Sequence, residues 1–376
     1  MYEITLRFSV EFRPDPCYDL CMKKCLSILI LLLLLAGCAR GAAPEEASAP
    51  QAEVLPAATA APVTAAPTAK AEQKISIGAS VTATATPPAT PAPSPVPTPT
   101  PEPTPAPTPF SLVAIPDTQA LAYSKPEVIR EVRDWIEAHR DSDNILGILH
   151  TGDMVDNGYK EWEWDNLAPL LEAAHDGMFL LPVAGNHDLG TEAKSYYAYL
   201  KRPFLNEYPD EQKFEGGKML YRVLSAGGED ILLLGVGWDS YQSSAAKAWL
   251  DKVFSDHADL PCILVTHGFL LSNGSYIAAM EQLVARYGAI HLVICGHSRD
   301  YQTRVFSYDD DGNGTTDRDV NVLMLNMQAK ADYAFRLLTF DPLTHSVTVR
   351  TLTPAGAPAS DIPGAGPISF TLENAY

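Results

Sequence analysis

The chain has 376 residues, of which 46% are hydrophobic and 19% are charged, so it is long enough to bury a sizeable core. It carries 27 lysines and arginines against 46 aspartates and glutamates, which gives a formal net charge of −19 at pH 7. This acidic balance argues against a nucleic-acid-binding surface and against a polybasic patch for membranes. A phosphate-containing ligand is compatible with it only if a local feature reverses the sign of the charge.

The region 1–38 is typical of a targeting signal. From Met22 the sequence reads MKKCLSILILLLLLAGC, which places two lysines before a short apolar run and small residues before a cysteine. This order resembles a bacterial lipoprotein signal, in which Cys38 would be lipidated and become the mature N-terminus. An uncleaved anchor helix is the alternative. Both interpretations predict an extracytoplasmic protein that is anchored to the cell membrane, with Met22 as the true start.

Residues 39–109 consist mainly of alanine, proline and threonine and end in TPAPSPVPTPTPEPTPAPTP. Closely spaced prolines fix φ and remove hydrogen-bond donors, so neither a helix nor a sheet can form here. We expect a disordered, extended tether that holds the following domain away from its anchor. A docking ligand for another protein is a weaker alternative.

Few cysteines remain outside the signal region. Four of the six lie at or before Cys38, which leaves Cys262 and Cys295, each inside a predicted strand. Two separate buried thiols are the commoner arrangement, although the sequence leaves a bridge between them open.

From Phe110 onward, apolar runs alternate with helical periodicity, which predicts one domain over residues 110–376. Strands are expected over 110–117, 144–153, 178–186, 218–226, 230–238, 262–268 and 290–297. Helices are expected over 125–140, 162–175, 192–200, 244–254 and 277–288. After residue 300 only strands are indicated, over 303–308, 320–328, 335–341 and 346–352. This order predicts an α/β fold in which helices cover the sheets.

Polar side chains follow five of these strands. In chain order they are Asp117 and Gln119; Asp153 and Asp156; Asn186, His187 and Asp188; His267; and His297 and Arg299. The carboxyl ends of strands in open α/β sheets meet at a common crevice, where ligand-binding groups converge. Glycines beside the last four sets fit the tight turns that such a crevice needs.

Each set taken alone also has a structural interpretation. Asp117 is suited to a turn or a helix cap, and Gly152 with Asp153 makes a common strand-end turn. A single histidine after an apolar strand is more often a hydrogen-bonded core residue than a ligand. The joint occurrence of five suitable sets in order favours a common site.

The ordered set resembles the calcineurin-like metallophosphoesterases, whose pattern is D-x-H, GDxxD, GNH[DE], a strand-end histidine and GHxH. The matching motifs here are PDTQ, GDMVD, GNHD, THG and GHSR. The resemblance covers roughly residues 110–355 and implies a two-layered β-sandwich flanked by α-helices, with a pair of divalent metal ions (Mn, Fe or Zn) bound at the strand ends.

The resemblance also implies a role for each motif residue. Asp153 would bridge the two metal ions, with Asn186, His267 and His297 completing one site and Asp117 and the side-chain oxygen of Gln119 completing the other. His187 would stabilise the transition state or protonate the leaving group, and Asp156 or Asp188 would orient it. A metal pair would then supply the positive charge that the composition lacks.

Two residues depart from the family pattern, both at the second metal ion. Gln119 stands where the first motif usually has histidine, and an amide oxygen can replace it as a weaker ligand. Arg299 stands where the last motif has its second histidine, and a guanidinium cannot coordinate. Arg299 could bind the substrate phosphate in place of a metal, Asp300 or water could fill the coordination position, or catalysis could be lost.

The sequence therefore predicts metal-dependent hydrolysis of a phosphate monoester or diester by a metal-activated water at the cell surface, with no protein partner. The alternative is a catalytically impaired phosphate-binding or cell-surface interaction module, and a glycan hydrolase is a weaker third. Several aromatic residues could line a cleft or belong to the core. They are Trp162, Trp164, Tyr196, Tyr197 and Trp238.

Overall fold

The computed structural model describes residues 107–190, 193–328, 333–361 and 368–376. The predicted signal region and nearly all of the predicted tether lie outside these residues. Within the described part of the chain, no helix is both long and apolar enough to cross a membrane.

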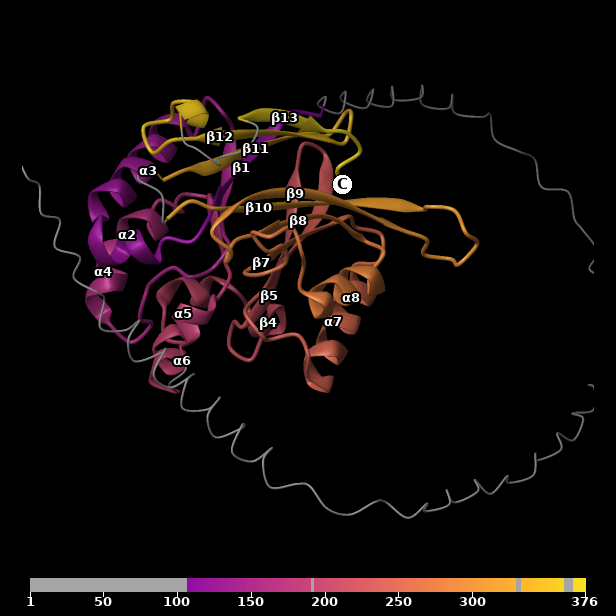
Figure 1. Ribbon diagram of the computed structural model, residues 1–376, viewed down its shortest axis with the longest axis horizontal. Coiled ribbons are helices and arrows are strands. Elements are labelled where there is room, and N and C mark those ends of the chain that lie inside the picture. Colours follow the sequence, from indigo (N-terminus) through magenta and orange to yellow (C-terminus); the bar gives the residue numbers. More distant parts are fainter. Residues whose placement is uncertain (1–106, 191–192, 329–332, 362–367) are drawn as a thin grey trace, which may run out of the picture. The chain divides into compact units, whose positions relative to one another are not determined.

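Two β-sheets form the centre of this part of the chain (Figure 1). The first has the strand order β13-β12-β11-β1-β2-β3 and the second has the order β4-β5-β6-β7-β8-β10-β9. The first sheet consists of β1 (Phe110–Ile115), β2 (Ile145–His150), β3 (Phe179–Pro182), β11 (Phe335–Asp341), β12 (Ser346–Leu352) and β13 (Ser369–Leu372). The second consists of β4 (Lys213–Phe214), β5 (Met219–Ala226), β6 (Glu229–Val236), β7 (Cys262–Thr266), β8 (Ile290–Cys295), β9 (Asp300–Tyr308) and β10 (Arg318–Asn326).

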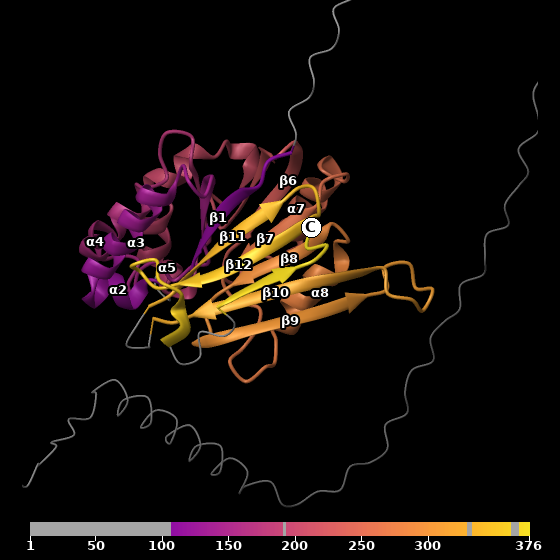
Figure 2. The ribbon, with the colours of Figure 1, turned by 90° about the horizontal axis from the view of Figure 1, so that it is seen from above.

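The two sheets pack face to face and are flanked by helices (Figure 2). Alternation along β7 shows this, because Ile263 and Val265 belong to the core between the sheets, whereas Cys262 and Leu264 pack toward helices. The helices are α2 (Gln119–Ser124), α3 (Pro126–His139), α4 (Glu161–Leu171), α5 (Asn186–Leu189), α6 (Ala193–Tyr199), α7 (Ser244–Asp256) and α8 (Ala278–Arg286). The predicted fold class, an α/β sandwich flanked by helices, is confirmed.

Parallel pairing brings the carboxyl ends of the strands together within each sheet. In the first sheet β1, β2 and β3 run parallel. In the second, β6, β7, β8 and β10 run parallel. Because both faces of these strands are covered, they read as apolar runs whose polar residues come only after the strand ends.

Some elements have no clear sequence signal. The short helices α2 and α5 begin directly after strand-end motifs, and neither has a side-chain cap hydrogen bond from its N-cap residue to backbone. Helices of six and four residues are too short to display an amphipathic period. Cys262 and Cys295 are buried free thiols, in agreement with the commoner of the two arrangements.

Candidate metal centre

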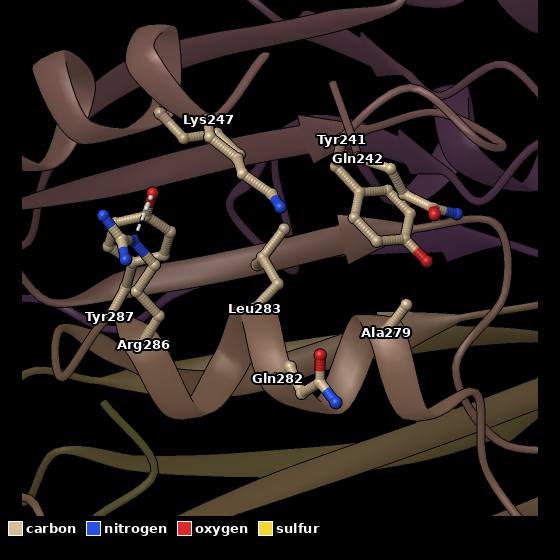
Figure 3. A pocket seen from close by; sticks show the side chains of 9 residues that line it. Tyr241, Gln242, Lys247, Ala279, Gln282, Leu283, Arg286 and Tyr287 are labelled. Atoms are coloured by element: carbon tan, nitrogen blue, oxygen red, sulfur yellow. Dashed lines mark hydrogen bonds between the residues drawn. The ribbon is translucent and has the colours of Figure 1, made fainter. Parts of the chain in front are cut away.

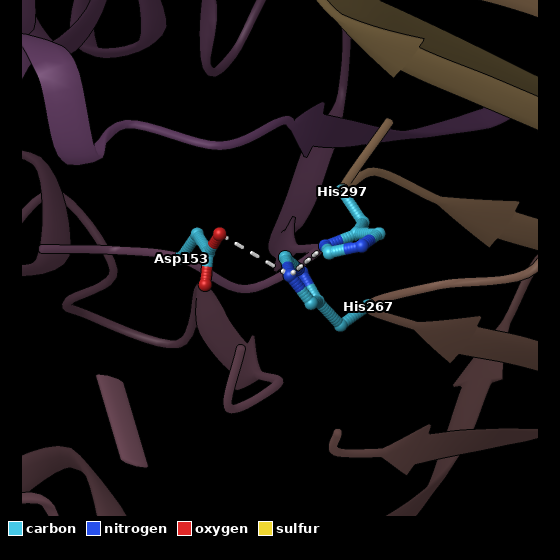
Figure 4. Close-up of side chains that lie close together, drawn as sticks. All are labelled: Asp153, His267 and His297. Atoms are coloured by element: carbon cyan, nitrogen blue, oxygen red, sulfur yellow. Dashed lines mark hydrogen bonds and ion pairs between the residues drawn. The ribbon is translucent and has the colours of Figure 1, made fainter. Parts of the chain in front are cut away.

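The strand-end residues from both sheets meet at one edge of the sandwich. Asp117, Asp153 and Asn186 follow strands of the first sheet, whereas His267 and His297 follow strands of the second. Asp153, His267 and His297 each place a potential ligand atom within 4.8 Å of the others (Figure 4). The site therefore straddles the two layers of the sandwich.

Three potential ligand atoms surround the Nε2 atom of His267, which is the fourth. Nε2 lies 3.1 Å from Nδ1 of His297 and 3.1 Å from Oδ1 of Asn186. It lies 3.3 Å from Oδ2 of Asp153. Atoms bound at about 2.0 to 2.2 Å to one tetrahedral ion lie about 3.3 to 3.6 Å from each other, so small side-chain movements would let these four atoms bind one ion.

A backbone contact fixes which nitrogen of His267 faces this cluster. Nδ1 of His267 lies 2.9 Å from the carbonyl oxygen of Thr151, which can only accept, so Nδ1 carries a proton. Nε2 is therefore the ring nitrogen that faces the cluster. Hydrogen bonds of this kind to the second ring nitrogen orient metal-binding histidines in proteins.

Asp117 and Gln119 are the predicted ligands of the second ion. The backbone N–H of His297 donates to both carboxylate oxygens of Asp117, at 2.8 and 3.0 Å. The side chain of Gln119 is buried, and its Oε1 has no hydrogen-bond partner among the described residues. A buried amide oxygen without a partner is costly, and coordination of an ion would satisfy it.

The pKa values of the buried acids and of His267 are shifted by burial and by the charges of these groups on one another. Burial raises the pKa of Asp117 to about 8, although the nearby His267 opposes this. Burial also acts to raise the pKa of Asp153, but the charge and hydrogen bond of His267 outweigh it and the pKa is lowered. Burial acts to lower the pKa of His267, and Asp153 and Asp117 outweigh it, so that this pKa is raised to about 9. Buried acids in this arrangement need a cation.

His187 lies beside the cluster and is oriented by Asp156. Its Nδ1 donates to the backbone carbonyl of Asp156 at 2.9 Å and lies 3.3 Å from Oδ1 of the same residue. Its backbone N–H donates to Oδ1 of Asp153 at 2.8 Å. The hydrogen bond that His187 donates to the Asp156 side chain, together with the charge of Asp153, raises the pKa of His187 to about 9 against the effect of burial.

Asp188 binds backbone N–H groups, whereas the family resemblance allowed it to orient the ring of His187. Its side chain is buried and accepts hydrogen bonds from the backbone N–H groups of Val155 and Gly185, at 3.0 and 2.8 Å. It therefore ties the GDMVD and GNHD loops together. Of the two aspartates, Asp156 is the one in contact with the His187 ring.

Arg299 forms no hydrogen bond or ion pair with the residues of the cluster. It is exposed, and no hydrogen bond or ion pair joins its guanidinium to another described residue. The neighbouring Asp300 begins β9, and its carboxylate accepts from the backbone N–H of Tyr301 at 2.9 Å. Neither residue stands in for the second histidine of the motif in this conformation.

Glycines leave room for the ligand side chains. A Cβ atom at Gly185 would lie 2.2 Å from Oδ1 of Asp153, and one at Gly296 would lie 2.9 Å from both carboxylate oxygens of Asp117. Asp153 and His297 themselves have positive φ angles of 47° and 66°. Non-glycine residues in this region are strained, and such strain is concentrated at functional sites.

His150 and Trp238 contact residues of the site without being predicted ligands. Nδ1 of His150 accepts a hydrogen bond from the backbone N–H of Gly152, so the ring proton is on Nε2. The hydroxyl of Thr118 donates to the carbonyl of Met154, and it therefore accepts from Nε2 of His150. Sequence reasoning missed His150 because it is the last residue of a buried strand. The Trp238 ring lies against His297 with a centroid separation of 4.5 Å, so this aromatic residue does line the site.

Comparison with known proteins agrees with the geometry. The sequence pattern described as calcineurin-like phosphoesterase matches residues 110–300, slightly more than half of the chain. The chain belongs to this family. The calcineurin-like phosphoesterase match includes every strand-end motif described above, and it confirms the resemblance that the sequence indicated.

Individual relatives are distant. The chain is 29% identical over 258 residues to the uncharacterized protein YvnB of Bacillus subtilis (strain 168), covering 65% of this chain and 20% of YvnB. A dimetal phosphatase from Danio rerio is 12% identical with a TM-score of 0.46, covering 66% of this chain and 99% of that one. The purple acid phosphatase PPD1 from yellow lupin is 13% identical with a TM-score of 0.45, covering 71% of this chain and 54% of that one. The chain thus spans about a fifth of the length of its curated relative.

We expect that Gly185→Ala weakens metal binding at least tenfold while the protein remains folded. The new methyl group would push both the backbone and the carboxylate of Asp153 out of place, because its backbone nitrogen and Oδ1 each lie only 2.2 Å from the position that a Cβ atom would take. Isothermal titration with Mn²⁺, together with circular dichroism, measures both effects. Gly288→Ala is the matched control, since its Cβ would meet no atom closer than 3.6 Å. Equal Mn²⁺ affinity in the two variants would show that Gly185 does not shape the metal centre.

Proposed function

We propose that this chain hydrolyses phosphate monoesters or diesters with the help of two divalent metal ions at the bacterial cell surface. The observation that carries the proposal is the convergence of Asp153, Asn186, His267 and His297 on one point of a calcineurin-like phosphoesterase domain. Ions at this point would polarise the phosphate and lower the pKa of a bound water, so no side-chain nucleophile is needed.

The protein side chains would divide the remaining work. Asp117, Gln119 and the shared Asp153 would hold the second ion, whose identity (Mn, Fe or Zn) the mixed oxygen and nitrogen ligands leave open. His187, held by Asp156, would keep a proton on the ring and donate it from Nε2 to the leaving oxygen. Asp188 would fix the two loops relative to each other.

Turnover and metal content test this proposal together. We expect the purified protein to bind up to two equivalents of Mn²⁺ and to hydrolyse p-nitrophenyl phosphate or its bis ester. Asp153→Asn should lower kcat at least a thousandfold, because it weakens the ligand shared by both ions. Asp259→Asn, which changes an exposed carboxylate after α7, is the control. A protein that binds no metal and turns over neither ester would be a phosphate-binding or interaction module instead.

Arg299 decides how complete the second metal site is. Because a guanidinium cannot coordinate, we expect the second ion to bind more weakly than the first. Arg299→His would restore the residue type of the family motif and should raise the affinity for the second Mn²⁺ at least tenfold, while Arg299→Ala should not. Elemental analysis after dialysis at graded Mn²⁺ concentrations measures this. No gain in the histidine variant would mean that another group supplies the coordination position.

We also propose that the phosphoesterase domain of residues 110–376 is held outside the cytoplasm by lipidated Cys38 and the tether of residues 39–109. The support is the MKKCLSILILLLLLAGC sequence and the proline-rich stretch that follows it. Cys38→Ser should release the protein from the membrane fraction or leave it as an unprocessed precursor. Membrane-bound protein of mature size in that variant would contradict the lipid anchor.

A further inference from the structure

A pocket of about 330 Å³ opens beside the candidate acid His187. Asp156, Tyr159, Asn186, His187 and Ser195 contribute to its walls. Another pocket of about 360 Å³ lies between α7 and α8 and includes Tyr241, Lys247 and Arg286 (Figure 3). None of the residues that line this second pocket is a predicted metal ligand, and Arg286 is already paired with Asp251. Of these two pockets, the one at His187 is therefore the one that adjoins the candidate acid.

The orientation of the His187 ring connects this pocket with the leaving group. Nδ1 is engaged by the carbonyl of Asp156, so Nε2 is the ring nitrogen left to donate a proton. The side chain of His187 is 37% exposed and forms part of the pocket wall. A phosphate held by Asn186 and its neighbours would have its leaving oxygen near Nε2, and the rest of the leaving alcohol would extend into the pocket.

Tyr159 forms an aromatic wall of the same pocket. Its side chain is 38% exposed, and the ammonium of Lys194 lies 3.7 Å from the ring centroid. A large aromatic ring that stays partly exposed beside a catalytic group is available for stacking. The lysine contact holds the ring in place from one side.

The loop that carries Tyr159 is fixed before any ligand arrives. The backbone N–H of Asn157 donates to the buried carboxylate of Glu163 at 2.8 Å, and the indole N–H of Trp164 donates to the carbonyl of Gly158 at 2.8 Å. The backbone N–H of Gly158 donates to the carbonyl of His187 at 3.3 Å. The wall and the acid therefore belong to one preorganised unit, which lowers the entropy cost of binding.

We infer that this pocket binds the leaving alcohol, that the preferred alcohol carries a ring, and that Tyr159 determines this specificity. The inference rests on the proposed function. Small-molecule sites begin at about 300 Å³ and one water fills about 30 Å³, so a short alcohol would leave most of the 330 Å³ pocket to water. In the reaction the phosphorus–oxygen bond to the alcohol breaks and a water oxygen bonds to phosphorus. His187 gives a proton to the leaving oxygen of the alcohol. The proton that the attacking water loses restores the protonated form of His187.

Two alkyl esters with leaving groups of similar acidity test the specificity. We compare kcat/KM for 2-phenylethyl phosphate and butyl phosphate with the Mn²⁺-loaded protein. The wild type should prefer the phenylethyl ester about tenfold, and Tyr159→Ala should abolish most of this preference. Tyr159→Phe, which keeps the ring, should retain the preference within twofold. Tyr197→Ala, which removes a tyrosine that is 60% exposed and does not line the pocket, should also retain it.

A binding measurement separates failure of this inference from failure of the proposed function. The non-hydrolysable 2-phenylethylphosphonate should bind the Mn²⁺-loaded wild type several-fold more tightly than butylphosphonate, and Tyr159→Ala should lose that difference. If both esters resist hydrolysis but the phosphonates show this pattern, the pocket assignment stands and the hydrolase proposal fails. Equal binding of the two phosphonates, or an unchanged preference in Tyr159→Ala, overturns the assignment of Tyr159. Absence of binding by both phosphonates rejects the pocket as a subsite.

Discussion

The concentration of buried carboxylates at one edge of the sandwich is the constraint on which the rest of the site depends. Asp117, Asp153 and Asp188 are all buried, and the charge of Asp153 acts to raise the pKa of both Asp117 and Asp188. Burial of an unpaired charge costs several kcal/mol, so these groups must be compensated by hydrogen bonds or by cations. Backbone N–H groups compensate Asp188, whereas Asp117 and Asp153 also face imidazoles and an unpaired amide oxygen, which together form a place for positive ions.

This constraint links the metal centre with the packing of the two sheets. The carboxylates come from the first sheet and the imidazoles from the second, so the distances within the cluster depend on how the sheets pack. The core between the sheets fixes that arrangement, because interiors are close-packed and resist sliding. Glycines at the strand ends then let the loops approach more closely than any side chain would permit. Stability of the sandwich and geometry of the site are therefore inseparable.

An acidic protein can bind an anionic phosphate ester if positive charge is concentrated at the binding site. Ions held at the cluster would reverse the sign of the potential where an anionic ester must bind, while the net charge of −19 stays on the rest of the protein. The candidate acid His187 contacts the cluster through Asp153, and the Trp238 ring packs against the ligand His297. The proposed second ion would have the weaker set of ligands, because Gln119 and Arg299 stand where the family pattern has histidines.

The sequence alone determined the helices longer than about two turns, the order of the strand-end motifs and the strands except β4 and β13, because buried parallel strands and amphipathic helices leave periodic apolar patterns. It also indicated the correct family, because GDMVD and GNHD are short motifs that can be recognised without the fold. Only the tertiary structure decided that Asp156 and not Asp188 contacts the His187 ring, that Arg299 is exposed, and that His150 forms hydrogen bonds to the loops of the site. These outcomes depend on which side chains two packed sheets and their loops bring within hydrogen-bond distance, and residues far apart in the chain carry no local pattern that records such contacts.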